Sequence, residues 1–218
     1  MSTPNFDAIV FDMDGTLFDS STLVPDAYRA TMGLVGGPAI SRDEVIQRYH
    51  LGPPHNIMND LLGIDSGPEV IDEAVERYHG QLSAELASLN PYEGIREVVT
   101  ELGLAMPLGV FTGADTKSAL MLLEGAGLLA LFSATCGTEP GMPPKPAADG
   151  LLLTCAKLGV RPDRVAYIGD GPLVQRCARA AGAFAVAAGW GHLRDDTEPT
   201  DLYAETPHEL LTLLSEPR

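Results

Sequence analysis

Short apolar runs alternate with segments of helical apolar spacing along the second half of the chain. The apolar runs predict strands over residues 107–112, 131–136, 165–169 and 184–187, and one more at the start of the chain over 6–11. The segments between them predict helices over 115–126, 146–158, 173–181 and 207–214. This alternation predicts an α/β fold, a Rossmann-like parallel sheet with helices on both faces. Ligands bind such sheets at the carboxyl ends of the strands.

The segment over residues 20–90 has a different pattern, with helical spacing throughout and no alternation of the kind that strands show. Ser41 and Glu44 have the spacing of a capping box, which marks the start of a helix. We therefore predict an α/β core domain formed by 1–19 and 91–218, into which an all-helical domain is inserted.

Composition narrows the range of partners. The chain has 218 residues, of which 45% are hydrophobic and 20% charged, as in an ordinary globular protein. It carries 30 acidic and 14 basic residues, a net charge of −16, and this argues against nucleic acid as a partner. No apolar run approaches the roughly 18 residues of a membrane span, and no signal-peptide pattern opens the chain, so we expect a cytoplasmic protein with no membrane partner. The three cysteines are far apart, which favours neither disulfides nor a zinc site.

The strongest chemical signal follows the first predicted strand. Asp12 and Asp14 are two residues apart, and Gly15 and Thr16 complete a DxDGT sequence. Taken alone, the pair of acids fits a solvated turn equally well. At the end of a buried strand, however, two carboxylates in one pocket repel each other and need a cation, for which Mg²⁺ is the natural candidate.

Four motifs in order resemble those of the haloacid dehalogenase superfamily. The segment from Asp12 to Thr16 resembles its motif I, Thr112 matches motif II, Lys145 matches motif III, and Asp170 after Gly169 matches motif IV. The helical insertion between motifs I and II resembles the C1 cap of phosphoglycolate-phosphatase-like members. The similarity extends over nearly the whole chain.

The resemblance implies a Mg²⁺-dependent phosphatase acting on a small phosphorylated metabolite, such as phosphoglycolate, a sugar phosphate or a nucleotide. It implies that Asp12 attacks phosphorus and forms an aspartyl-phosphate. Asp14 would protonate the leaving oxygen and then deprotonate the attacking water. To act as an acid at neutral pH, Asp14 needs a raised pKa, which a neighbouring carboxylate favours and Mg²⁺ opposes.

The resemblance also implies which groups hold the phosphate and the metal. Lys145 would offset charge on the phosphoryl oxygens and on the nucleophile. The Thr112 hydroxyl and the backbone N–H groups of Met13 and Gly113 would hold the remaining oxygens. The implied Mg²⁺ ligands are the Asp12 carboxylate, the Asp14 backbone carbonyl and the Asp170 carboxylate.

The sequence leaves two alternative functions open. Many family members have a second acid four residues after the motif IV aspartate, where this chain has Val174. A non-catalytic phosphate-binding relative is therefore one alternative. A phosphomutase is another, although the related mutases carry a cap histidine where this chain has Val24. Asp14 itself argues against carbon–halogen chemistry, because haloacid dehalogenases lack this second aspartate.

The inserted helical domain is expected to select the substrate. Arg48, His50 and His55 flank the segment 51–54, which we expect to reach the pocket between the domains. The alternative for each of the three is a polar side chain on a surface helix. The segment 22–87 has four arginines and no lysine, so it is not built to bind a polyanion. Both a monomer and a homodimer are compatible with the sequence.

Overall fold

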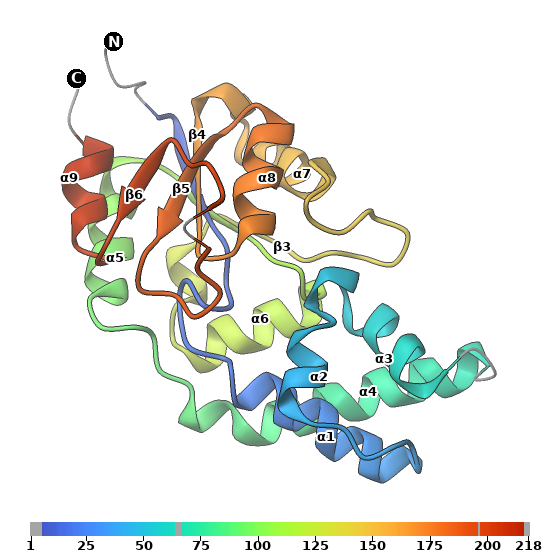
Figure 1. The fold of residues 1–218 in the computed structure, drawn as a ribbon. Helices are drawn as coiled ribbons and strands as arrows, with labels where there is room; N and C mark the ends of the chain where they lie inside the picture. Colours follow the sequence, from blue (N-terminus) through green and yellow to red (C-terminus); the bar gives the residue numbers. More distant parts are fainter. Residues whose placement is uncertain (1–5, 64–66, 196, 216–218) are drawn as a thin grey trace.

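The computed structural model describes residues 6–63, 67–195 and 197–215. Its centre is a parallel sheet of six strands in the order β3-β2-β1-β4-β5-β6 (Figure 1). The strands are β1 (Ala8–Phe11), β2 (Leu108–Phe111), β3 (Ala134–Cys136), β4 (Val165–Gly169), β5 (Phe184–Ala188) and β6 (Leu202–Ala204). The predicted α/β fold with a parallel sheet is confirmed.

Helices cover both faces of the sheet. Side chains of a strand alternate between its faces, and apolar side chains point to both, so each face needs a cover. In β1, Ile9 and Phe11 join one apolar core, whereas Ala8 and Val10 join the other. The first core is covered by α5 (Ile95–Ala105), α6 (Thr116–Gly125) and α9 (Glu209–Ser215). The second is covered by α7 (Asp149–Leu158) and α8 (Pro172–Ala181).

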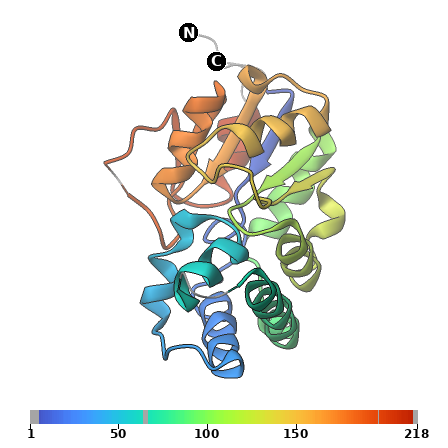
Figure 2. The ribbon, with the colours of Figure 1, turned by 90° about the vertical axis from the view of Figure 1, so that its right-hand side faces the viewer.

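The inserted part of the chain is helical, as the sequence predicts. It contains α1 (Leu23–Val35), α2 (Arg42–Ile46), α3 (Pro54–Leu62) and α4 (Pro68–Glu85), and short 3₁₀ turns at Tyr49–Leu51 and Leu86–Ser88. Below, α1 to α4 with the Tyr49–Leu51 turn are called the helical segment. In Figure 2 it lies below the sheet and the sheet's covering helices. The capping box at Ser41 and Glu44 opens α2 as predicted.

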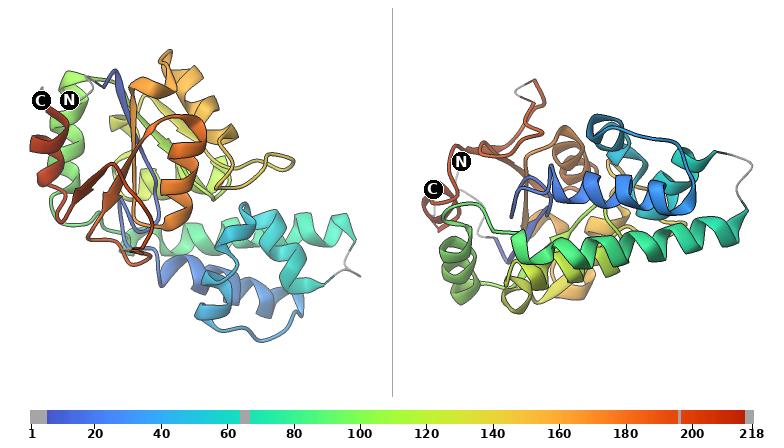
Figure 3. Two further views of the ribbon diagram at one scale, coloured as in Figure 1. Left: turned by 45° about the horizontal axis from the view of Figure 1, so that its top comes forward. Right: turned by 90° about the horizontal axis from the view of Figure 1, so that it is seen from below.

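Packing inside the helical segment centres on α1 and α4, which lie side by side (Figure 3). Tyr28 of α1 and Tyr78 of α4 are both buried, with ring centroids 4.3 Å apart. The apolar core around them is continuous with the core that covers the first face of the sheet. The helical segment is therefore packed onto the core rather than tethered to it.

The chain leaves and re-enters the α/β core at one place. Phe18 pairs with Pro91 in an isolated antiparallel bridge, and the Tyr92 N–H donates to the Leu17 carbonyl at 3.0 Å. These residues flank the predicted domain limits at 19/20 and 90/91, which stay a prediction. No helix in the described part of the chain is long and apolar enough to cross a bilayer.

Several elements differ from the sequence prediction. Helix α5 and strand β6 were not predicted, and a 3₁₀ turn at Leu129–Leu131 shortens the predicted strand over 131–136 to β3. Helix α7 begins at Asp149, three residues later than predicted, because residues 146–148 form a turn and a bend before it. Helix α9 begins at Glu209, two residues after the start of the predicted helix over 207–214.

Candidate active site

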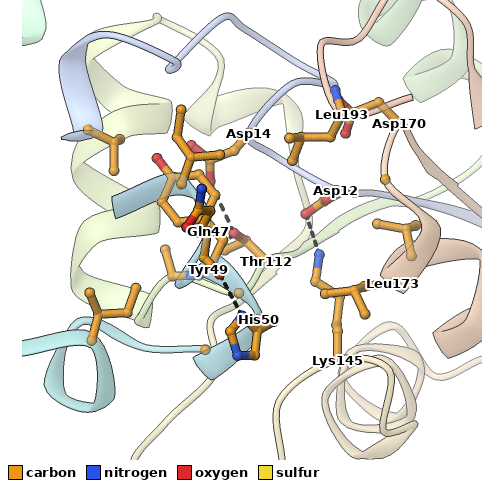
Figure 4. A pocket seen from close by; sticks show the side chains of 18 of the residues that line it. Asp12, Asp14, Gln47, Tyr49, His50, Thr112, Lys145, Asp170, Leu173 and Leu193 are labelled. Atoms are coloured by element: carbon orange, nitrogen blue, oxygen red, sulfur yellow. Dashed lines mark hydrogen bonds and ion pairs between the residues drawn. The ribbon is translucent and has the colours of Figure 1, made fainter. Parts of the chain in front are cut away.

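The sheet order brings the predicted motifs to one edge. Asp12 follows β1, Thr112 follows β2 and Asp170 follows β4, and these three strands are neighbours at the centre of the sheet. Lys145 comes from the loop after β3. Together with Asp14, these side chains line a cavity of about 400 Å³ (Figure 4). Parallel α/β sheets bind their ligands at this place, where the strand order reverses.

Asp12 and Lys145 form a buried ion pair at the base of the cavity. The Lys145 Nζ donates to the Asp12 Oδ1 at 2.7 Å, with side chains 9% and 10% exposed, respectively. The Asp12 N–H donates to the Ile168 carbonyl at 2.7 Å, which fixes this residue against β4. The Lys145 Nζ also lies 5.6 and 5.9 Å from the ring centroids of Phe111 and Tyr167. The ammonium group is thus held in place by the carboxylate and by two aromatic rings.

Asp14 lies beside this pair in a different environment. Burial raises the pKa of Asp14, and the negative charge of Asp12 adds to this effect. The Ser20 hydroxyl donates to the Asp14 Oδ1 at 2.5 Å, which counteracts part of the rise in pKa. The Thr112 hydroxyl makes a long contact of 3.5 Å with the Asp14 Oδ2. A carboxyl group with a raised pKa is suited to give and take a proton near neutral pH.

Asp170 is enclosed by backbone. A Cβ atom at Gly15, whose φ is +74°, would lie 2.2 Å from the Asp170 Oδ2, and one at Gly191 would lie 2.1 Å from the Asp170 Cβ. The Leu193 N–H donates to the Asp170 Oδ2 at 2.8 Å. The Asp170 Oδ1 is buried and has no hydrogen-bond partner among the described residues. Burial, together with the charge of Asp12, raises the pKa of Asp170 to about 6.

These oxygens fit a hard divalent cation such as Mg²⁺. Asp12, Asp14 and Asp170 line the same cavity, and Lys145 is the cation beside them. The buried Asp170 Oδ1 has no hydrogen-bond partner among the described residues. Mg²⁺ is bound through one or two carboxylates, with other oxygens and waters completing its octahedron. Among the described residues no three His, Cys, Asp or Glu side chains form a metal-binding group. The Asp14 backbone carbonyl, implied by the resemblance, remains the candidate for a third protein ligand.

Val174 occupies the place of the absent second acid with apolar packing. Its side chain is buried in the core beneath α8 and also lines the cavity. A Cβ atom at Gly169 would lie 2.6 Å from the Val174 Cγ1, so the valine packs directly on the backbone of Gly169. Val174 thus places an isopropyl group at the position where many members of the haloacid dehalogenase superfamily have a carboxylate.

The segment 51–54 reaches the cavity, as predicted. Gly52 and Pro54 line the cavity together with His50, whose Nδ1 lies 2.7 Å from the Gln47 carbonyl oxygen. Gly52 has φ +89°, and a Cβ atom there would lie 2.8 Å from the Pro144 Cβ. The helical segment therefore contacts the loop that carries Lys145.

Two of the other residues predicted to bind substrate point elsewhere. Arg48 donates to the Asp60 carboxylate and to the Glu44 carbonyl, each at 2.6 Å, and does not line the cavity. His55 is also outside the lining, with its Nε2 3.8 Å from the Asp72 carboxylate.

The two residues predicted to bind phosphate through their backbone N–H groups are placed differently. Gly113 lines the cavity together with Thr112. The Met13 side chain is fully buried in the core, which leaves its N–H as the group that can serve the site. Gly113 therefore lies at the cavity, whereas Met13 is outside the lining and could contribute only its backbone N–H.

Ser20, Tyr49 and Leu193 are among the residues around the site that were not predicted. Ser20 contacts Asp14, the Leu193 N–H contacts Asp170, and the Tyr49 ring lines the cavity from the helical segment. Ser20 lies close after the DxDGT sequence, and this proximity is a weak signal that was available. Nothing local marks Leu193 or Tyr49, because only the folded chain brings them to the site.

Comparison with known proteins places the chain in a family. A model of the haloacid dehalogenase-like hydrolases matches residues 9–188, so the protein belongs to this family. It is 29% identical to a phosphoglycolate phosphatase of Chromobacterium violaceum, over 98% of this chain and 99% of that protein. It is 28% identical to an N-acetylmuramic acid 6-phosphate phosphatase of Pseudomonas aeruginosa, over 95% of this chain and 94% of that protein.

Solved structures share the fold. The crystal structure of CbbY from Rhodobacter sphaeroides in complex with phosphate matches with a TM-score of 0.82. The match covers 94% of this chain and 96% of that one at 22% sequence identity. At this identity the likeness concerns the architecture alone, a parallel sheet with an inserted helical part.

Proposed function

We propose that the protein is a Mg²⁺-dependent phosphatase that hydrolyses a small phosphomonoester through an aspartyl-phosphate on Asp12. The observation that carries the proposal is the Lys145–Asp12 pair, joined at 2.7 Å at the base of the cavity, with the carboxyl group of Asp14 beside it. Membership of the hydrolase family and the phosphatases among its relatives support the same reaction.

In the first step, a carboxylate oxygen of Asp12 attacks phosphorus and the bond from phosphorus to the leaving oxygen breaks. Lys145 pairs with Oδ1, so Oδ2 is the oxygen that the ammonium group does not engage. The proton of Asp14 passes to the leaving oxygen, so that a neutral alcohol departs. The raised pKa of Asp14 is what this step needs, because the group must enter it protonated.

In the second step, water attacks the same phosphorus and the bond to Asp12 breaks, releasing inorganic phosphate. Asp14, now ionised, accepts the proton of that water and is ready for another cycle. Thr112 and Gly113 both line the cavity, and the Thr112 hydroxyl and the Gly113 N–H would hold phosphoryl oxygens in both steps. Mg²⁺, held by Asp12, Asp170 and the Asp14 carbonyl, would supply positive charge for the phosphoryl oxygens when bound.

The experiment that tests this function measures phosphate release from a generic aryl phosphate and from a panel of metabolites, with and without Mg²⁺. Asp12→Asn serves as the control for a contaminating phosphatase. The expected result is metal-dependent release that disappears in Asp12→Asn. Release that persists in the variant would show that Asp12 is not the nucleophile.

Neither alternative gains support of equal weight. Val24 is an apolar lining residue where the resembling mutases have a histidine, which disfavours a phosphomutase. Val174 is the one feature in favour of a non-catalytic phosphate-binding protein. That protein would bind a phosphate analogue and release no phosphate at any Mg²⁺ concentration.

A further inference from the structure

The wall that the helical segment contributes to the cavity is apolar and aromatic. Its apolar and aromatic members are Val24, Tyr28, Ile46, Tyr49, Pro54, Ile57 and Tyr78. The polar side chains it adds are those of Gln47 and His50. Phosphate chemistry takes place against the α/β core, so this wall faces the part of a substrate beyond the phosphoryl group.

Permanent positive charge among the described lining residues of the cavity lies at its base. Among the described lining residues, Lys145 is the one lysine or arginine, and its ammonium group is already paired with Asp12. The lining carboxylates include Asp195 at the rim as well as the three acids of the site. Arg48 is on the helical segment but is held by Asp60, outside the cavity. A second anionic group on a substrate would therefore be desolvated beside carboxylates and without a cation.

The hydroxyl group of Tyr49 adds a polar feature to this apolar wall. It is buried and has no hydrogen-bond partner among the described residues. Burial, together with the charge of Asp14, raises the pKa of Tyr49 well above its ordinary value, so the hydroxyl is neutral at working pH. Buried polar groups in folded proteins usually have partners, so a partnerless hydroxyl on a residue that lines a ligand cavity is a candidate to bond with a ligand.

We infer that the substrate's leaving group is an uncharged alcohol with an apolar or aromatic body and one polar group that bonds with the Tyr49 hydroxyl. This inference rests on the phosphatase function proposed above. It excludes phosphomonoesters that carry a second anion, whether a carboxylate or another phosphate. The cavity of about 400 Å³ is at the small end of the roughly 300–1,000 Å³ range of ligand pockets, which limits the body to a small molecule.

Three matched substrates test the inference, namely benzyl phosphate, 4-carboxybenzyl phosphate and 4-(hydroxymethyl)benzyl phosphate, with 2-phosphoglycolate beside them. All four substrates are assayed at the same pH and Mg²⁺ concentration. We expect kcat/KM for benzyl phosphate to exceed that for its carboxylated analogue by about 10–100-fold. We expect the hydroxymethyl compound to be the best of the three, and Tyr49→Phe to remove its advantage over benzyl phosphate.

Adding a cation to the wall should reverse the discrimination. Gln47→Lys places an ammonium group at a polar lining position and is expected to raise the relative kcat/KM of the carboxylated substrate by about tenfold. Val70→Lys is the matched control, since it adds the same charge on α4 at a side chain that is 45% exposed and outside the lining. The control should leave the ratio unchanged.

The possible outcomes separate the inference from the function beneath it. Preference for 2-phosphoglycolate or for the carboxylated benzyl ester would overturn the inference and leave the phosphatase intact. Absence of phosphate release from every substrate would overturn the proposed function. In that case the Tm shifts caused by benzylphosphonate and its 4-carboxy analogue measure the preference of the wall directly. A larger shift with the carboxylated compound would refute the inference as well.

Discussion

The contact between Gly15 and Asp170 leads to a prediction about the substitution Gly15→Ala. Gly15 has φ +74°, and a Cβ atom there would lie 2.2 Å from the Asp170 Oδ2. Gly36, at the end of α1, has φ +71° but no atom within 4 Å of the corresponding Cβ position. The two glycines thus share a left-handed backbone and differ in the space around them. Comparing them separates the cost of the backbone conformation from the cost of the close approach.

The magnitudes follow from this difference. A left-handed conformation costs a residue with a Cβ atom roughly 1–2 kcal/mol, which is our expectation for Gly36→Ala. Inserting a methyl group where there is no room costs a further 1–3 kcal/mol or so, because neighbours must shift. We therefore expect Gly15→Ala to lower the free energy of unfolding by about 2–5 kcal/mol. It should also reduce activity strongly, since the neighbour that must shift is Asp170.

The free energies of unfolding of both variants are measured in urea, with circular dichroism and fluorescence as the two probes of unfolding. Trp190 is the single tryptophan of the chain, and its Nε1 donates to the Thr16 carbonyl at 2.9 Å, so its fluorescence reports on the loop around Gly15. The reasoning is refuted if Gly15→Ala is as stable as Gly36→Ala and keeps wild-type activity. Equal stability of all three proteins would refute the conformational part as well.

Four more predictions concern single groups. Lys145→Met leaves the buried Asp12 carboxylate without its partner. We expect the free energy of unfolding in urea to fall by about 3–5 kcal/mol and kcat to fall by at least about 100-fold. Wild-type stability would contradict this prediction. Mg²⁺ at one hundred times its Kd should stabilise the protein by about 2.7 kcal/mol in thermal unfolding, and Asp170→Asn should abolish the effect. Val174→Asp should tighten Mg²⁺ binding by about tenfold. It should also lower the stability of the metal-free protein, since position 174 is buried. A titration that shows unchanged Mg²⁺ affinity would count against a supporting role for the missing acid. Hydrogen bonds from Arg42 lower the pKa of Asp26 to about 2, so its ion pairs stabilise the fold above its ordinary pKa, and this contribution is lost as pH falls toward 2. Asp26→Asn should therefore cost less than about 1 kcal/mol in urea unfolding at pH 7, because the pair is exposed, and progressively less as pH falls through about 2, where Asp26 becomes protonated in the folded protein.

The fold was largely predictable, because buried parallel strands and their covering helices differ in apolar pattern. Helix α5 was readable in principle, since Ile95, Val98, Val99 and Leu102 have helical spacing and are all buried. Strand β6 was not readable, because it has three residues of which one, Tyr203, is exposed. A strand this short takes its conformation from pairing with β5, which no local pattern encodes.

The candidate site divides in the same way. Its central acids and Lys145 were predictable because four motifs occur in the order found in the resembling family, although Lys145 or Asp170 alone would not have indicated a site. The partners of Arg48 and His55 depend on how α2, α3 and α4 pack, and the sequence could not show that both side chains face neighbouring acids instead of the cavity. The apolar wall around Tyr49 arises in the same way from several helices and is visible only in the folded chain.

The order of the strands also bears on how the chain folds during synthesis. Strand β1 is made first, yet its Ile9 pairs with Leu108 on one side and with Ala166 on the other. Both neighbours are made after the helical segment, and contacts between residues this far apart in sequence form slowly. A nascent chain that ends before Val165 has β1 with an unpaired edge, and such edges associate with other strands. Truncated forms that lack β4 are thus expected to aggregate rather than to fold around the remaining strands.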